Sequence, residues 1–454
     1  MINSRWWLRV VSVRLLLLFL FFSGVDISAQ VPGNGSVRSE SSDEVSVRLA
    51  RLKARRFLDK EQALGDFYSI DSSGISLFAS AEKKSAGEPE FKVYWNEINY
   101  LRQLIRDSSE ASYLKFLIEK KSDRISADRL KKINASGQPA NKSRPAQSGS
   151  VQDDSLLKGI RIALDPGHVA DDIGMAKLEK KYIEMNLKLA NGDSKKIELI
   201  ESRLTYETAM LLKSKLERQG ATVLLSRPEH SDFENWLSTS FSRVTDSLFS
   251  TNDLSEKERT FLLTRATKRA IFKDVYVGLE TQQRARKINA FQPDYTLIIH
   301  YNVDETNTGW TRPSSRDYDM VFVGGSFMKN ELEKQQSRAE FLRMLITDDI
   351  DNSILFSSYV IKSFEQVLKV PTAQQSDAKY LKDFCLPAGE NGVFCRNLML
   401  TRLVHGTLVY GETLYQDNQT ELELLSGPDI PDRVGEVANA YYEAIIKSIK
   451  KAVH

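Results

Sequence analysis

The sequence is poor in cysteine and histidine, with 2 Cys and 5 His in 454 residues. Two cysteines cannot build the multiple cross-links of a small disulfide-stapled protein. No segment after residue 25 is apolar over the ~18 or more residues that a membrane helix needs, which excludes a polytopic membrane protein. No Gly-x-Ser-x-Gly motif is present, so a serine hydrolase of the type that needs this turn is disfavoured. The 41% of hydrophobic residues exclude a wholly disordered chain.

An excess of either charge is also lacking, since 63 Lys and Arg face 61 Asp and Glu. A nucleic-acid partner is therefore not expected, because it requires a basic surface. The first residues contain Arg5, Arg9 and Arg14, then an apolar run over 15–25 and small residues up to Ala29. This pattern predicts a secretory signal over residues 1–29 that is cleaved after Ala29. An uncleaved anchor is the alternative, and the mature chain is expected to have no membrane span.

Composition divides the rest of the chain into two parts. Residues 134–155 are rich in Ser, Asn, Gln, Pro and Gly, which is typical of a flexible linker. The linker separates an N-terminal module, residues 30–133, from a C-terminal domain, residues 156–454. The module has helical spacing and no motif that indicates chemistry, so we expect a small mixed or helical unit. In an exported protein Cys385 and Cys395 either pair or remain free thiols, and the sequence leaves both open.

The C-terminal domain alternates strand and helix patterns, which predicts an α/β fold. We expect a mixed or mostly parallel sheet flanked by helices on both faces. Strands are predicted at Ile160–Leu164, Ala221–Ser226, Tyr295–His300, Met320–Val323 and Thr407–Gly411, and helices at Leu204–Gly220, 256–290 and 432–452. Functional sites of such sheets gather at the carboxyl ends of the strands.

Two histidines stand where predicted strands end. His168 follows the strand-like run IRIALDPG, and His300 ends the run TLIIH. A single histidine is usually an ordinary packed side chain. Two histidines with the same placement favour a shared site, and neutral imidazole is a natural zinc ligand.

Four segments resemble, in the same order, the zinc-dependent N-acetylmuramoyl-L-alanine amidases: LDPGHVADDIG, IESRLTYETAMLLKSKLERQGATVLLSR, QQRARKINAFQPDYTLIIHYN and GTLVYGETLYQDN. The corresponding features of the family are a DPGH motif, a Glu before a helix, a strand that ends in His-x-Asn and a late strand that ends in Glu. The segments cover under a quarter of the chain. Their joint occurrence and order make the resemblance specific, although each segment alone is degenerate.

The resemblance implies that His168, Glu201 and His300 hold Zn²⁺, a His₂Glu set that leaves a position open for water. It also implies that Glu412 is the catalytic carboxylate, which takes a proton from the attacking water. Nearby alternatives to Glu201 as the carboxylate ligand are Glu179, Glu184 and Glu198.

Four further residues are candidates for binding substrate or for supporting the ligands. Asp165 either orients His168 or caps the Asp-Pro turn. Asn302 either holds its loop or touches substrate. Arg284 matches an arginine of the family, although an arginine on a helix surface is the simpler interpretation. His405, seven residues before Glu412, is a candidate substrate-binding residue.

The sequence departs from the family pattern in several places. Residues 177–197, 228–280 and 303–395 are longer than the family core requires, and we expect such insertions to form loops above the strand ends. One of them is expected to act as a lid or regulatory helix. Val169 and Ala170 stand where the family has two glycines, which bears on the choice of substrate.

The sequence therefore predicts an exported zinc hydrolase of the periplasm or cell envelope. The resemblance implies cleavage of the amide between N-acetylmuramic acid and L-alanine in peptidoglycan, and it allows a protein activator or regulator as a partner. A zinc peptidase or carboxypeptidase that acts on stem peptides is one alternative. A catalytically inactive wall-binding protein is the other.

Overall fold

The computed structural model describes residues 42–107, 110–136, 156–188, 192–250, 255–307, 309, 312–426 and 430–453. The predicted signal, residues 1–29, and most of the predicted linker lie outside these residues. The described chain from Asp43 onward forms one compact unit. No helix among the described residues combines the length and the apolar character needed to cross a membrane.

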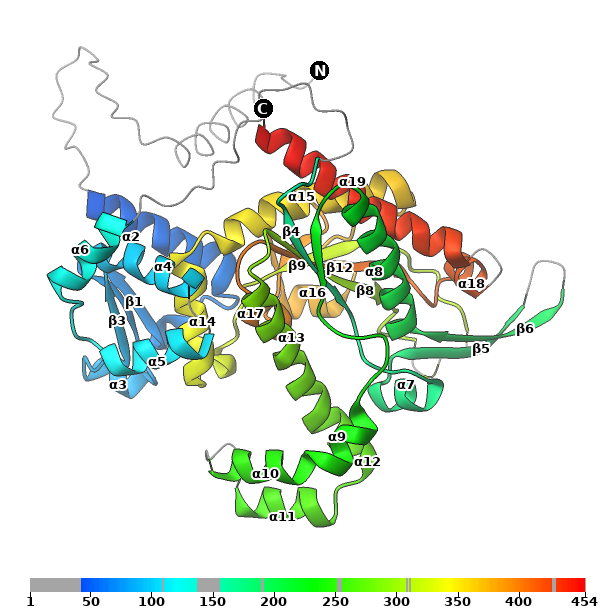
Figure 1. The fold of residues 1–454 in the computed structure, drawn as a ribbon, viewed down its shortest axis with the longest axis horizontal. Helices are drawn as coiled ribbons and strands as arrows, with labels where there is room; N and C mark the ends of the chain where they lie inside the picture. Colours follow the sequence, from blue (N-terminus) through cyan, green and yellow to red (C-terminus); the bar gives the residue numbers. More distant parts are fainter. Residues whose placement is uncertain are drawn as a thin grey trace. The chain divides into compact units, whose positions relative to one another are not determined.

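A mixed sheet of seven strands organises the C-terminal part (Figure 1). Its order is β10-β11-β9-β12-β8-β4-β7. The strands are β4 Arg161–Pro166, β7 Thr222–Leu225, β8 Tyr295–Asn302, β9 Met320–Val323, β10 Leu386–Pro387, β11 Val393–Cys395 and β12 Leu408–Tyr415. The four strands β12, β8, β4 and β7 are parallel, and β9 runs antiparallel to β12. The predicted mixed, mostly parallel sheet is confirmed.

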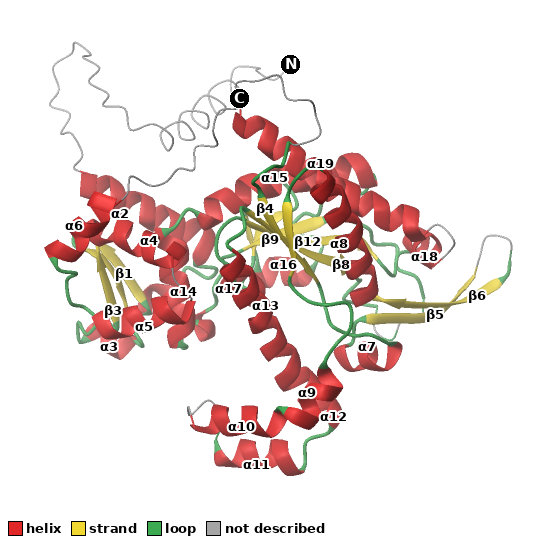
Figure 2. Cartoon of the chain, in the orientation of Figure 1, coloured by secondary structure: helices red, strands yellow, loops and turns green. Residues whose placement is uncertain are grey.

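Helices cover both faces of this sheet, as predicted (Figure 2). One face packs against α8 Glu201–Arg218, α15 Asp349–Leu368 and α19 Ile430–Val453. The other face packs against α13 Val277–Phe291, α16 Lys379–Phe384 and α17 Met399–Leu403. Alternate strand residues point to opposite faces, so a side chain two positions along a strand stays on the same face.

The N-terminal module is a mixed unit, one of the two forms predicted. Its antiparallel sheet β1-β2-β3 is covered by short helices. The elements are α2 Ser42–Lys53, η1 Ala54–Leu58, η2 Leu64–Asp66, β1 Tyr68–Asp71, β2 Gly74–Leu77, α3 Ala81–Ser85, β3 Phe91–Tyr94, η3 Trp95–Glu97, α4 Ile98–Asp107, α5 Glu110–Lys120 and α6 Ala127–Ser136.

This module shares a continuous hydrophobic core with the C-terminal part through α14 Gln335–Ile346. The Lys53 ammonium donates to the Asp351 carboxylate over 2.6 Å. The Arg338 guanidinium donates to both Glu90 carboxylate oxygens, at 2.5 and 3.0 Å. The two parts are therefore packed together over residues 43–136 and 156 onward.

The segments expected to form loops above the strand ends contain more ordered elements than the strand predicted at Met320–Val323 and the helix predicted over 256–290. Residues 303–395 supply β9 and β11 of the main sheet together with α14, α15 and η6 Lys329–Glu331. Residues 177–197 contribute most of an antiparallel hairpin, β5 Tyr182–Lys188 and β6 Ser194–Ile200, which precedes α8. In that hairpin Ile183, Met185 and Leu187 are buried alternately with more exposed residues.

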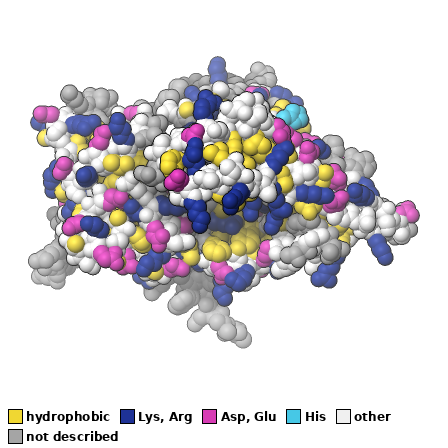
Figure 3. Space-filling model, turned by 90° about the horizontal axis from the view of Figure 1, so that it is seen from below, with side chains coloured by type: hydrophobic (Ala, Val, Ile, Leu, Met, Phe, Trp, Pro, Cys, Tyr) yellow, Lys and Arg dark blue, Asp and Glu magenta, His cyan; other side chains and the backbone are white. Residues whose placement is uncertain are grey.

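Residues 233–276 form an arm of short helices that projects from the sheet (Figure 1). The arm contains α9 Phe233–Thr239, α10 Phe241–Ser250, α11 Glu256–Thr264, α12 Lys268–Ile271 and η5 Phe272–Tyr276. Its base packs on Val169, the residue after His168, and on α7 Ile173–Glu179. On the side from which the arm projects, hydrophobic side chains lie among Lys and Arg side chains (Figure 3).

Both cysteines are free in the structure. Cys385 and Cys395 are fully buried thiols, and burial raises the pKa of each above its ordinary value. A buried thiol that stays protonated is a weak nucleophile and a poor metal ligand. The cysteines therefore act as packed apolar side chains.

Gly411 shows how closely α19 supports the strand that carries Glu412. A Cβ atom at position 411 would lie 1.9 Å from the Tyr441 hydroxyl oxygen, and Tyr441 is fully buried in α19. We expect Gly411→Ala to lower the free energy of unfolding by about 1–3 kcal/mol, because overpacking a rigid core forces side chains out of place. Urea denaturation measures this change.

Gly435→Ala is the matched control, because Gly435 lies in α19 and a Cβ there meets nothing within 4 Å. Alanine is a better helix former than glycine, so this variant should gain up to about 1 kcal/mol. Equal stability of the two variants would contradict the predicted clash.

Candidate functional site

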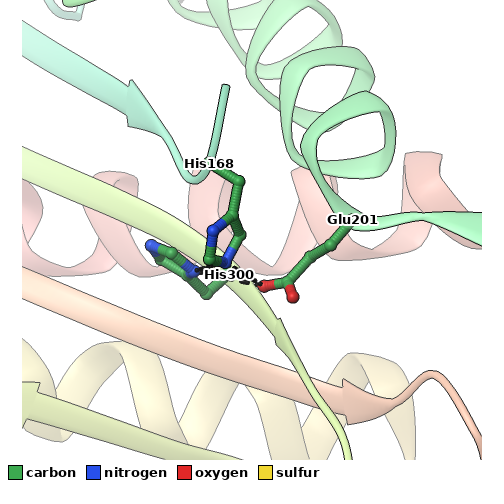
Figure 4. Close-up of side chains that lie close together, drawn as sticks. All are labelled: His168, Glu201 and His300. Carbon is green, nitrogen blue, oxygen red and sulfur yellow. Dashed lines mark hydrogen bonds and ion pairs between the residues drawn. The ribbon is translucent and has the colours of Figure 1, made fainter. Parts of the chain in front are cut away.

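Three side chains converge at the carboxyl ends of β4 and β8 (Figure 4). The His168 Nε2 atom lies 3.0 Å from Glu201 Oε1. The His300 Nδ1 atom lies 3.1 Å from His168 Nε2 and 3.2 Å from Glu201 Oε1. The family resemblance implied this triplet, and the structure brings all three donor atoms together.

The spacing of these atoms fits a tetrahedral metal ion. Bonds of about 2.0–2.1 Å from zinc to nitrogen and oxygen place neighbouring ligand atoms about 3.3 Å apart. The second carboxylate oxygen of Glu201, Oε2, is buried and accepts no hydrogen bond from any described residue. Two imidazoles and one carboxylate are the donor types that catalytic zinc uses, so these residues fit the ion.

A tight turn after β4 sets the position of His168. Gly167 leaves room for the neighbouring ring, because a Cβ there would lie 2.3 Å from His300 Cε1. His168 itself has a left-handed backbone with φ of 60°. Hydrogen bonds to the carbonyl of Gly167 come from Thr205 Oγ1 at 2.8 Å and from Arg227 Nη2 at 3.2 Å. The turn is thus fixed from α8 and from the segment after β7.

Glu201 is the first residue of α8, directly after β6. A carboxylate in the first turn of a helix is stabilised by the helix dipole. Burial would raise the pKa of Glu201, but His168 and Lys181 hold it well below its usual range. Lys181 is the residue just before β5, and its ammonium lies 3.6 Å from Glu201 Oε2.

Glu179, the last residue of α7, contacts the other nitrogen of the first histidine. Its Oε1 atom lies 3.0 Å from His168 Nδ1, and its Oε2 atom accepts from the backbone N–H of Val169 at 3.4 Å. Burial would raise the pKa of Glu179, but His168 lowers it. A carboxylate in this place fixes the ring orientation and the tautomer that leaves Nε2 free for a metal. From the sequence, Glu179 was expected only as an alternative to Glu201 as the carboxylate ligand.

We expect Glu179→Gln to weaken zinc binding about 10- to 100-fold, because partners behind a metal-binding histidine have effects of this size. Competition with a zinc indicator dye measures the affinity. Glu184→Gln is the control, since Glu184 lies on the neighbouring hairpin and pairs with Lys177 and Lys196 on the surface. An unchanged affinity in Glu179→Gln would contradict this role.

Glu412 lies beside the triplet on the neighbouring strand. Its register partner on β8 is His300, so the two side chains share one face of the sheet. Burial, and then the charge of Glu201, raise the pKa of Glu412 to about 7. A carboxyl group with this pKa can both accept and return a proton near neutral pH.

Asp165 and Arg284 support the turn rather than the imidazole ring. Asp165 is fully buried, accepts a hydrogen bond from Ser226 Oγ and lies 3.6 Å from Arg284 Nη1. Arg284 is only 5% exposed and donates to the carbonyls of Pro166 and His168, both over 2.9 Å. The simpler interpretation of Arg284 as a helix-surface residue is therefore wrong, and the carboxylate on the His168 ring is that of Glu179.

Asn302 holds the end of β8. Its side-chain oxygen accepts from the backbone N–H of Val303 at 2.8 Å, and its carbonyl accepts from the N–H of Gln416 at 2.9 Å. These contacts match the loop-holding role that the sequence analysis gave as one of two alternatives.

His405 lies away from the triplet. It precedes β12, whose first residue Leu408 pairs with Thr296 near the start of β8, so it stands at the opposite edge of the sheet from His300. Its Nε2 atom lies 3.9 Å from Glu340 Oε1 on α14. The expectation that His405 binds substrate at this site is not supported by that placement.

Tyr410 is a site residue that the sequence analysis missed. Its ring stacks on His300 with centroids 4.4 Å apart and planes 8° apart. It stands two residues before Glu412, and the alternation along β12 would have placed it on the same face. The stacked ring restrains the orientation of the His300 imidazole.

Comparison with known proteins gives a family match over most of the C-terminal part. The sequence profile of the family described as N-acetylmuramoyl-L-alanine amidase matches residues 162–447. The match includes all three residues of the triplet together with Glu179 and Glu412. No curated protein sequence matches this chain.

Solved structures similar to this chain include amidases from several bacteria. The amidase Ami1 of Mycobacterium smegmatis is 14% identical, with 65% of this chain and 99% of that chain covered and a TM-score of 0.36. The catalytic domain of CwlV from Bacillus (Paenibacillus) polymyxa is 13% identical, with 64% and 98% covered and a TM-score of 0.34. CwlD of Clostridioides difficile, solved in complex with the GerS lipoprotein, is 13% identical, with 64% and 99% covered and a TM-score of 0.34.

Proposed function

Because this chain belongs to the N-acetylmuramoyl-L-alanine amidase family, we propose that it is an exported, zinc-dependent enzyme that cleaves the amide between N-acetylmuramic acid and L-alanine. Family membership makes peptidoglycan the substrate. The observation that supports the zinc dependence is the convergence of two imidazoles and one carboxylate, 3.0–3.2 Å apart, with Glu412 beside them.

In this proposal His168 Nε2, His300 Nδ1 and Glu201 Oε1 hold the ion. Zinc bound there supplies a Lewis acid that polarises the scissile carbonyl and activates water. Glu179 and Tyr410 keep the two imidazole rings in place. The Gly167 turn and the strand end keep the donor atoms at the spacing that the ion requires.

Glu412 moves the proton. Its carboxylate takes a proton from water as the water oxygen bonds to the carbonyl carbon, and it returns that proton to the nitrogen of L-alanine as the carbon–nitrogen bond breaks. The products are the free lactyl carboxylate on the glycan and a stem peptide with a free amine. Amines are poor leaving groups, so the return of the proton is as necessary as its removal.

Product analysis of digested peptidoglycan tests the proposal. Intact stem peptides that begin with a free L-alanine amine, released only when zinc is present, are the expected result. Fragments cut within the stem would instead indicate the zinc peptidase alternative. Bound sacculi without any cleavage would indicate a wall-binding protein and would overturn the proposal.

Export is part of the same proposal, supported by the sequence of residues 1–29 and by a substrate that lies outside the cytoplasm. N-terminal sequencing of protein recovered from the cell envelope should then begin at Gln30. A protein activator or regulator remains a prediction. Pull-down from envelope extracts with the full mature chain would identify one.

A further inference from the structure

We propose that Arg396 is a specificity-determining residue that pairs with a free carboxylate of the stem peptide beside the scissile amide. The inference rests on the proposed function and adds a substrate-recognition residue to it. Arg396 follows β11, outside the four segments that carry the family resemblance.

Two aromatic rings hold the guanidinium over the sheet face that carries the site. The Arg396 Cζ atom lies 5.0 Å from the centre of the Phe322 ring and 4.8 Å from that of Tyr380. The backbone N–H of Arg396 donates to the Val323 carbonyl over 2.9 Å, so the chain is fixed at the end of β9. A guanidinium held by aromatic rings is preordered before any ligand arrives.

Strand register connects this guanidinium to the site. Phe322 on β9 stands opposite Tyr410 on β12, and their ring centres are 6.0 Å apart. Tyr410 in turn stacks on His300. The proposed metal ligand His300, the proposed base Glu412 and the Arg396 guanidinium thus lie over the neighbouring strands β8, β12 and β9, on one face of the sheet.

The separation suits a short piece of peptide. The contacts from Arg396 Cζ to the Phe322 ring (5.0 Å), from that ring to Tyr410 (6.0 Å) and from Tyr410 to His300 (4.4 Å) keep the guanidinium within about 15 Å of the His300 imidazole. Burial and Glu201 raise the pKa of Glu412, whereas the charges of Lys181 and Arg396 oppose that rise. The field of Arg396 therefore reaches the place where the amide would be cleaved.

Arg396 has no anionic partner among the described residues. Two buried arginines elsewhere are paired with carboxylates: Arg343 binds Glu340 and Asp349, and Arg433 binds Glu421 and Glu436. In the described part of the chain, the Arg396 side chain donates no hydrogen bond and forms no ion pair, and it is partly exposed. Its N–H groups are available to a ligand.

The chemistry of the guanidinium selects the ligand. Its planar fork of N–H donors matches a carboxylate or a phosphate, and it binds either through two parallel hydrogen bonds. The stem peptide carries free carboxylates beyond L-alanine, and an extended residue spans about 3.3–3.6 Å. A carboxylate two or three residues past the scissile amide would reach Arg396, while Lys181 is held by Glu201.

Two synthetic muramyl peptides test this inference, identical except that the stem carboxylate nearest the scissile amide is free in one and amidated in the other. Wild type should cleave the free acid with a kcat/KM about 10- to 100-fold higher, the size expected for a hydrogen bond to a charged group. Arg396→Gln should lose that advantage, mainly through a higher KM, and should match wild type on the amide. Arg396→Lys keeps the charge without the fork and should fall between the two.

Arg259→Gln is the matched control, since Arg259 lies on the arm and pairs with Asp246. It should behave as wild type on both substrates, and thermal melting should show Arg396→Gln folded. Equal losses on both substrates, or no loss on either, would overturn the role of Arg396. Failure of wild type to cleave either compound at the lactyl–alanine amide would instead overturn the proposed function.

Discussion

His300→Ala is expected to leave a folded protein that neither retains zinc nor cleaves peptidoglycan. His300 supplies one of three donor atoms that lie 3.0–3.2 Å apart, and its loss leaves one imidazole and one carboxylate. Lewis-acid stabilisation of several kcal/mol, at about 1.4 kcal/mol for each factor of ten, corresponds to a loss of about 10³-fold or more in kcat. Elemental analysis after dialysis and release of soluble stem peptides measure the two effects.

His230→Ala is the matched control, because the His230 side chain is 79% exposed on a loop and lies outside the triplet. It should retain both zinc and activity. Treatment of wild type with a chelator should reproduce the His300→Ala result, and added zinc should restore wild type alone. A His300→Ala protein that keeps its zinc and its turnover would contradict the assigned ligand set.

Glu412→Gln is expected to lower kcat about 10²- to 10⁴-fold while zinc content stays unchanged. The amide of glutamine fills the same space but cannot accept the proton from water, and general base catalysis contributes an effect of this size. Because the residue touches neither His168 nor Glu201 through any hydrogen bond in the described structure, the metal site should stay intact. Glu390→Gln, in the turn before β11 where Glu390 pairs with Lys362, should leave kcat unchanged.

Glu412→Gln, which lowers kcat, should not lower the stability of the metal-free protein above the pKa of Glu412. Burial, then Glu201, raise the pKa of Glu412 from 4.5 to about 7 in the metal-free protein. The folded chain thus binds more protons than the unfolded chain between these values, and stability is lost as the pH rises through that window. At pH 8, metal-free Glu412→Gln should melt at the same temperature as metal-free wild type or at a higher one. At pH 4 the two proteins should melt at the same temperature. A lower melting temperature at pH 8 would contradict the predicted cost of the buried charge.

The strand ends were the most predictable part of the site. The apolar runs before His168 and His300 form β4 and β8. Because these strands are parallel neighbours, the two histidines lie at the same edge of the sheet. Glu201 was expected just before a helix, and it is the first residue of α8. These predictions depend on local hydrophobic periodicity, which a sequence displays. They also depend on the rule that functional sites gather at the carboxyl ends of parallel strands.

Contacts set by the path of the chain could not be predicted. Glu179 ends α7 and Glu201 begins α8, and the hairpin β5–β6 between them decides which one reaches the metal side of His168. His405 illustrates a different error, since proximity in sequence to Glu412 was taken for proximity in space. Seven residues of extended chain cover roughly 23 Å, which is enough to reach the other edge of the sheet.

The hairpin β5–β6 and the strand β11 were not predicted, for another reason. Buried residues alternate in β5, but charged residues on the other face gave the segment a polar composition typical of a loop. Strand β9 was predicted, whereas its antiparallel pairing with β12 depends on a connection longer than any local pattern. Topology across long connections is not encoded in the periodicity of single elements.

The continuous core beneath α14 has a practical consequence for anyone who trims this enzyme. Tyr68 of the N-terminal module packs its ring against Phe341, 5.1 Å away, and Phe341 is fully buried. A fragment cut to the residues that the family profile matches would present this aromatic surface to water and would tend to self-associate. The N-terminal module is therefore an integral part of the hydrophobic core of the catalytic domain, not a separable accessory domain.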